Sequence, residues 1–152
     1  MKTLKDLLNE IYKSKKDIPP NKIGKVSTWQ EIFGEKIPKD NSNYVYHVTT
    51  EDRISSIKKN GLTTNNDTNF LDFSNKKYIS FSEKMDDVIY WSTSIFWRNY
   101  DKGYIKKTII LRVHKNNILN LERWRQDEVR TAENIPNDKI DIWNNNTWKP
   151  IK

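Results

Sequence analysis

Three short polar segments of this sequence hold the residue types that could do chemistry. His47 ends an apolar run and is one of only two histidines in the chain. Ser80 and Ser82 place two hydroxyl groups two residues apart, so they would share one face of a strand. Gln126 and Glu128 have the same spacing ahead of another apolar run. These groups could together bind and orient a polar ligand without a metal.

Each segment also has a structural interpretation. A lone histidine in a strand is commonly a satisfied structural residue, a Ser-x-Ser strand is commonly an edge, and a glutamate at the start of a strand is commonly solvated. The second histidine, His114, is expected to be structural because it follows directly on the apolar run 109–113. Spacing alone therefore leaves both interpretations open for the three segments.

Composition limits the class of protein. The 152 residues suffice for one domain with a sizeable core, and six Trp supply core volume. The absence of cysteine excludes disulfides and thiolate metal sites, and with only two histidines we expect no metal. No signal-peptide pattern and no apolar run of about 20 residues is present, so we expect a cytoplasmic protein that does not contact a membrane.

The formal net charge of +7 would attract phosphate-bearing partners. The basic residues are spread along the chain, so a solvated lysine-rich surface explains them as well as a nucleic-acid footprint does. Arg123, Arg125 and Arg130 flank Glu128. They could hold a pyrophosphate or an acceptor phosphate, or they could be ordinary surface arginines.

Local patterns predict the elements that must position these residues. Apolar residues at i, i+3, i+4 and i+7 predict an amphipathic helix over 3–15, and residues 28–34 are typical of a short helix ended by glycine. Residues 44–62 are predicted to form a strand, a tight turn and a short helix that stops at Asn60-Gly61.

The rest of the chain is predicted to supply most of the sheet. The expected elements are a loop over 63–75, strand 77–82, helix 85–98, strand 103–114, loop 122–128, strand 128–132 and strand 135–143 broken by Pro136. Strand 103–114 is expected to be central because it is almost continuously apolar. The Ser92-Thr93-Ser94 run falls inside the predicted helix. This order predicts an α+β domain over 41–152, preceded by a helical extension over 1–40.

Taken in order, the polar segments resemble motifs of the ADP-ribosyltransferase superfamily, whose members use NAD. The matching segments are Tyr46-His47-Val48-Thr49, Asn60-Gly61-Leu62, Ile79-Ser80-Phe81-Ser82, Gln126-Asp127-Glu128 and Ile135-Pro136. The resemblance covers about residues 44–143 and implies a split β-sandwich fold. The chain combines the histidine of one subclass with the Ser-x-Ser of another, so the resemblance leaves the subclass open.

The resemblance implies a mono-ADP-ribosyltransferase that transfers ADP-ribose from NAD to a macromolecule and releases nicotinamide. Glu128 would be the catalytic carboxylate, and Gln126 would help to choose the acceptor. The residues implied to contact NAD are His47, Val48, Thr49, Ser80, Phe81, Ser82 and Tyr90.

The chemistry of the reaction suits these residue types. Cleavage of the nicotinamide–ribose bond passes through an oxocarbenium-like sugar cation, which a fixed carboxylate stabilises. The resemblance further implies that His47 binds the adenosine-side ribose, that Ser80 orients Glu128, and that Phe81 or Tyr90 stacks on the nicotinamide.

The glutamine at position 126 and the basic charge together favour a nucleic-acid base in DNA or RNA as acceptor, with a protein side chain as the alternative. A toxin-like enzyme of this kind could have an antitoxin or immunity protein as partner. Three other functions remain open. The first is a non-enzymatic basic module that binds single-stranded nucleic acid. The others are an NAD-dependent RNA 2′-phosphotransferase and a nuclease that uses His47 as general base.

Overall fold

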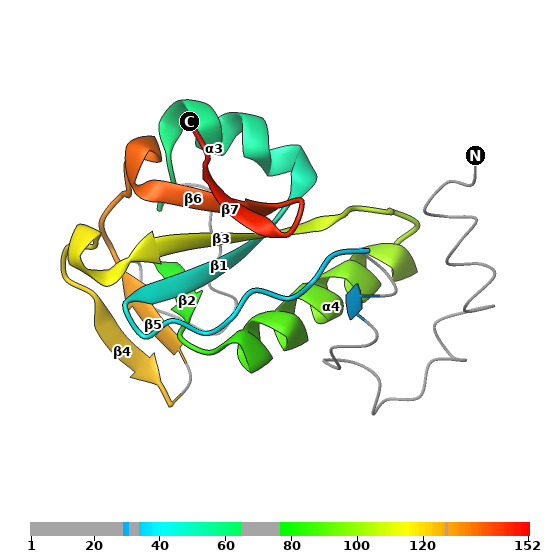
Figure 1. Cartoon of the computed structure of the whole chain (residues 1–152), viewed down its shortest axis with the longest axis horizontal. Coiled ribbons are helices and arrows are strands. Elements are labelled where there is room, and N and C mark those ends of the chain that lie inside the picture. Colours follow the sequence, from blue (N-terminus) through cyan, green and yellow to red (C-terminus); the bar gives the residue numbers. More distant parts are fainter. Residues whose placement is uncertain (1–28, 31–33, 65–76, 127) are drawn as a thin grey trace.

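The computed structural model describes residues 29–30, 34–64, 77–126 and 128–152. They form one seven-stranded antiparallel sheet in the order β4-β5-β2-β1-β3-β6-β7, with a helix on each face (Figure 1). The predicted α+β class is confirmed. The helix predicted over 3–15 lies outside the described residues, as does most of the loop predicted over 63–75.

Most predicted elements are present with shifted ends. The strands are β1 (Tyr44–Thr50), β2 (Ile79–Ser82), β3 (Thr108–His114), β4 (Glu122–Arg125), β5 (Glu128–Thr131), β6 (Ile140–Asn144) and β7 (Thr147–Pro150). The helices are η3 (Glu51–Arg53), α3 (Ile54–Asn60), α4 (Met85–Asp101), η4 (Lys115–Asn117) and η5 (Asn137–Lys139). The strand–turn–helix unit predicted over 44–62 is therefore confirmed.

The sheet consists of two ladders with a narrow connection. β1 pairs with β3 along its whole length, from Tyr44↔His114 to Thr50↔Thr108. β2 pairs with β5 along its whole length as well. Between these two ladders, β1 and β2 are paired at one position only, Tyr46↔Ser82. Beyond that pair the two strands part.

Strand alternation sends side chains to two separate cores. Tyr46 and Ile110 point to the α4 side, shown at the bottom of Figure 1, and pack with the buried face of that helix. Val45 and Leu111 point to the α3 side, at the top of the same view, and pack with Ile57. The Ser92-Thr93-Ser94 run lies in α4 as predicted, and the Ser92 hydroxyl is 2.5 Å from the Thr108 hydroxyl.

The described residues before β1 belong to the α4 side of this structure. Trp29 is 1% exposed, and its indole N–H donates to Ser92 Oγ at 3.0 Å. Asp40 accepts a hydrogen bond from the Met85 amide at 2.6 Å and so satisfies a donor at the start of α4, where Lys84 gives no side-chain cap. Gly34, with φ +66°, donates to the Gln30 carbonyl, which agrees with the predicted helix stop.

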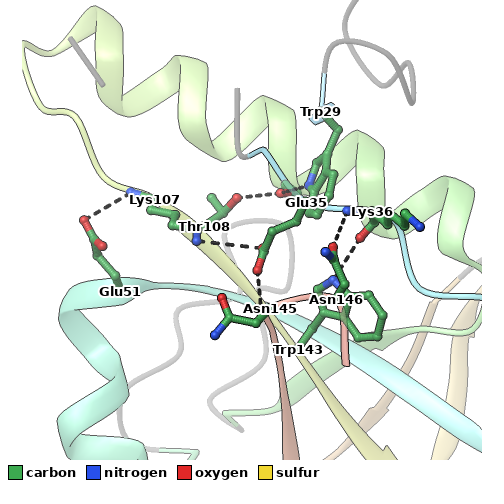
Figure 2. A network of polar contacts seen from close by, with 10 residues as sticks. Trp29, Glu35, Lys36, Glu51, Lys107, Thr108, Trp143, Asn145 and Asn146 are labelled. Atoms are coloured by element: carbon green, nitrogen blue, oxygen red, sulfur yellow. Dashed lines mark hydrogen bonds and ion pairs between the residues drawn. The ribbon is translucent and has the colours of Figure 1, made fainter. Parts of the chain in front are cut away.

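The same segment is fastened to the far edge of the sheet (Figure 2). Glu35 accepts from the Asn145 amide at 2.9 Å and lies 3.8 Å from the Lys107 ammonium. The Lys36 amide donates to Asn146 Oδ1 at 2.6 Å. The described part of the predicted extension therefore shares contacts with both α4 and the β6–β7 turn.

The loop prediction for residues 122–128 is wrong, because Glu122–Arg125 form strand β4 paired with β5. Three of its four side chains are charged and the fourth is Trp124, so the segment shows no apolar face. An edge strand needs neither an apolar face nor a second neighbour, and charge protects it from pairing with other chains.

Two other differences arise at turns. The strand predicted from residue 103 begins at Thr108, because Gly103 has φ +88° and the Tyr104 amide still bonds to the Asn99 carbonyl at the end of α4. Strand β7 was not predicted. It forms because Asn145 and Asn146 both have positive φ, 51° and 62°, in a two-residue hairpin turn that suits the twist of the strands.

The turn after α3 gives a test of the fold. Gly61 has φ +74° and ψ −167°, a region open essentially to glycine alone, and an added Cβ would lie 2.1 Å from the Ile135 carbonyl oxygen. Gly61→Ala is therefore expected to lower the free energy of unfolding by about 3 kcal/mol or more in urea denaturation.

Gly103→Ala is the matched control for this prediction. Gly103 also has positive φ, but its Cβ would meet no atom of the described residues within 4 Å. We expect a loss of only about 1–2 kcal/mol there. Equal losses for the two variants would contradict the close approach of Gly61 to Ile135.

Candidate functional site

His47 lies where β1 and β2 part. Its Nδ1 is 2.8 Å from the Ser80 carbonyl oxygen, and its ring meets the Phe81 ring edge-on at a centroid distance of 5.8 Å. A carbonyl oxygen only accepts hydrogen bonds, so Nδ1 must carry the hydrogen. In the neutral imidazole, Nε2 is therefore an acceptor, which suits a ligand hydroxyl group.

A pocket of about 250 Å³ opens beside His47. Its lining residues come from β1, from the helical turns that follow, and from the chain after α3: His47, Thr49, Arg53, Ser56, Ile57, Gly61, Leu62 and Thr63. One wall is fixed by reciprocal backbone hydrogen bonds of 2.9 Å between Leu62 and Ile135. An imidazole, a guanidinium and three hydroxyls around an apolar floor are chemically suited to a phosphoribosyl group.

Two residues of the pocket, Arg53 and Ser56, were not predicted from the sequence. They are three positions apart at the start of the helix that follows the His47 strand, so their side chains lie on one side of it. That spacing was a usable signal once the helix had been predicted. Whether these side chains lie near His47 depends on how the helix packs against the sheet, which the sequence did not show.

Glu128 begins β5 and lies directly opposite Ser82 in the ladder between β2 and β5. Ser80 lies opposite Arg130. Since paired residues of an antiparallel ladder share a face, Glu128 and Ser82 are neighbours on one side of the sheet. The serine next to Glu128 in the ladder is thus Ser82, whereas the resemblance implied Ser80.

The candidate residues divide between the two sides of the sheet. Ser82 pairs with Tyr46, so Ser82 and Glu128 face the α4 side, whereas His47 and Phe81 face the α3 side. Thr49 joins His47 in lining the pocket. The pocket is not lined by Val48, Ser80, Phe81, Ser82, Tyr90, Gln126 or Glu128.

Three predicted site residues, Phe81, Tyr90 and Gln126, differ in how far they are buried. Phe81 is 2% exposed and belongs to the α3-side core. Tyr90 is 52% exposed on α4, with its ring edge-on to Trp91 at 5.5 Å. Gln126 is exposed two residues before the start of β5. Phe81 is therefore placed to support the His47 ring, and Tyr90 is open to solvent or to a ligand.

The arginines near Glu128 have partners within the protein. Arg123 pairs with Glu83, and Arg130 pairs with Glu122 at 3.2 Å. The Arg130 guanidinium also lies 3.8 Å from the centre of the Tyr78 ring, and that of Arg125 lies 4.1 Å from the centre of the Trp124 ring. Two of the three guanidiniums thus already hold carboxylates.

Hydrogen bonds and nearby charges lower the pKa values of two carboxyl groups, those of Glu83 and Asp52. Partial burial acts to raise the pKa of Glu83, but the hydrogen bond and charge of Arg123 and the charge of Lys115 outweigh it, so the pKa is lowered. A hydrogen bond from the Thr50 hydroxyl, helped by Lys106, lowers the pKa of Asp52. Both carboxylates are therefore ionised at neutral pH.

His114 has a local structural contact. Its Nδ1 accepts a hydrogen bond from the Asn116 amide at 3.1 Å at the start of η4, and its ring meets Tyr44 edge-on. In the described part of the chain, no group of three metal-ligating side chains is gathered, and no helix is both long and apolar enough to cross a membrane.

The hydrogen bond to Ser80 predicts the tautomer of His47. In long-range ¹H–¹⁵N spectra, recorded at a pH where the ring is neutral, Nδ1 should carry the proton and Nε2 should be unprotonated. His114 is the internal control, because its Nδ1 accepts a hydrogen bond and the opposite tautomer is expected. A proton on Nε2 of His47 would contradict the proposed acceptor.

Comparison with known proteins gives no family for this chain: no protein-family model matches it, and no curated protein matches its sequence.

Proposed function

We propose that the protein is a mono-ADP-ribosyltransferase of split β-sandwich type that transfers ADP-ribose from NAD to a macromolecular acceptor. The observation that carries the proposal is the succession β5-β2-β1, in which Glu128 lies opposite Ser82 and His47 lies where β1 and β2 part. Two strand spacings, about 10 Å, separate β1 from β5. The segments around His47, Ser82 and Glu128, three of those that resemble the superfamily, are thus on neighbouring strands.

In this proposal, NAD extends from one side of the sheet to the other. The adenosine half occupies the pocket on the α3 side, where His47 Nε2 accepts from a ribose hydroxyl and Arg53 supplies positive charge for a phosphate. The nicotinamide riboside lies on the α4 side, against Glu128. The backbone pairing of β1 and β2 ends next to His47, and the proposal places the crossing of NAD there.

The reaction needs a carboxylate more than any other group. When the nicotinamide–ribose bond breaks, its electron pair leaves with nicotinamide and positive charge develops on the sugar. The Glu128 carboxylate stabilises that charge, and the Ser82 hydroxyl opposite it can hold the carboxylate in place. The acceptor nitrogen then bonds to the sugar carbon and gives up a proton, which the carboxylate can take.

The acceptor in this proposal is a base of DNA or RNA, with a protein side chain as the alternative. Gln126 is exposed two residues before Glu128, where its amide can pair with an amide-like edge of a base. The net charge of +7 favours a polyanionic acceptor. As a toxin-like enzyme, the protein would have an antitoxin or immunity protein as a further partner.

One observation favours a second candidate, a binding module for single-stranded nucleic acid. Trp124 on the edge strand β4 lies 4.1 Å from the Arg125 guanidinium and 4.8 Å from that of Arg130. Aromatic and guanidinium groups side by side are common platforms for unpaired bases. This candidate requires no NAD, which separates it from the transferase.

The transferase predicts that Glu128→Gln removes activity while the fold survives. With labelled NAD and separate pools of DNA, RNA and protein, the variant should label the acceptor at least about 100-fold more slowly than the wild type. Glu133→Gln is the matched control, because Glu133 is an exposed carboxylate just beyond the other end of β5. Labelling by Glu128→Gln at the wild-type rate would exclude this mechanism.

NAD binding can be tested separately from turnover. NAD at 100 times its dissociation constant should stabilise the wild type by about 2.7 kcal/mol in thermal melts. His47→Ala should reduce this stabilisation, whereas His114→Ala should keep it, because His114 lies outside the pocket. Absence of any NAD effect, together with salt-sensitive stabilisation by an oligonucleotide, would favour the binding module.

A further inference from the structure

The β4–β5 turn, which carries Gln126 and leads into Glu128, is held by one arginine. Arg123 Nη1 donates to the Gln126 carbonyl at 3.0 Å and to the Arg125 carbonyl at 3.5 Å. Its Nη2 donates to Glu83 Oε1. A planar guanidinium with five donors can make these contacts at once, which a lysine ammonium cannot do with the same geometry.

Glu83, the partner of Arg123, is also held in place. Glu83 follows directly on Ser82, the residue opposite Glu128. Its second oxygen, Oε2, lies 3.5 Å from the Lys115 ammonium, which comes from η4 after β3. The Glu83 side chain is 25% exposed and the Arg123 side chain 53%, so solvent partly screens the pair and its geometry matters more than its charge.

The position of Arg123 in β4 adds to this arrangement. The ladder between β4 and β5 shifts register between Arg123 and Arg125. Such a shift disrupts regular strand pairing locally. The guanidinium therefore supplies hydrogen bonds to carbonyls at the point where the ladder next to Glu128 is irregular.

The geometry points to Arg123 as a positioning residue that, together with Glu83, holds Gln126 and Glu128 in the arrangement needed for transfer of ADP-ribose to the acceptor. This inference rests on the proposed function. Arg123 acts through the turn and does not itself hold the substrate, because its guanidinium is already bound to a carboxylate and two carbonyls. This role differs from phosphate binding, which the sequence allowed for Arg123.

The test compares Arg123→Met, Arg123→Lys and Lys115→Ala. Arg123→Met removes the contacts to the turn and to Glu83, and we expect kcat to fall about 10- to 100-fold with KM for NAD changed less than about threefold. Arg123→Lys should recover part of kcat, since it restores the ion pair with Glu83 but not the hydrogen bonds of the guanidinium to the two carbonyl oxygens. Lys115→Ala removes only the outer ion pair of Glu83 and leaves the contacts of Arg123 to the turn, so kcat should fall less than in Arg123→Met.

Amide hydrogen exchange gives a readout that does not depend on activity. Exchange at the paired residues Arg125 and Glu128 should become faster in Arg123→Met and change less in Lys115→Ala. Unchanged exchange in Arg123→Met would overturn the positioning role whether or not the protein uses NAD. Faster exchange with wild-type kcat would overturn its link to catalysis. A wild type without NAD activity would reject the proposed function, while hydrogen exchange would still decide the role of Arg123 in the turn.

Discussion

A single register pair, Tyr46 with Ser82, joins the two ladders of the sheet, and the placement of each candidate residue depends on it. Tyr46 is 1% exposed beneath α4, and its hydroxyl accepts from the Asn41 amide at 3.0 Å, so this end of the connection is firmly held. Beyond the pair, the His47 side chain hydrogen-bonds to the Ser80 carbonyl. The strands can therefore separate without leaving that carbonyl unsatisfied.

The two halves of the sheet share the α3-side core but differ in their other contacts. On one side, α4 packs across β1 and β3, with Trp29 and Asp40 holding the helix from the preceding segment. On the other side, β2 and β5 contribute Ile79, Phe81 and Val129 to the α3-side core that they share with β1 and β3. The edge strand β4 is held by its ladder with β5 and by the Arg123–Glu83 pair.

The errors of sequence interpretation fall at the margins of the sheet. Glu122–Arg125 carries no apolar face because β4 is an edge strand, and Thr147–Pro150 is a strand because a favourable Asn145-Asn146 turn brings it beside β6. In both cases the decisive hydrogen bonds come from a neighbouring strand. Local propensity carries little information about such a neighbour.

The sequence by itself determined the elements that rest on local chemistry. These are the apolar strands around His47 and before His114, the helix carrying Ser92, and the stop at Gly61. Periodicity and backbone preference act within a few residues, so a linear pattern can show them.

Only the tertiary structure decided which polar residues meet. It paired Glu128 with Ser82, set His47 on the other side of the sheet, and brought Arg53 into the pocket and Arg123 onto the β4–β5 turn. These outcomes depend on the register between strands distant in sequence, and shifting a register by one residue reverses the face of each side chain. The physical reason is that packing of the two cores selects the register.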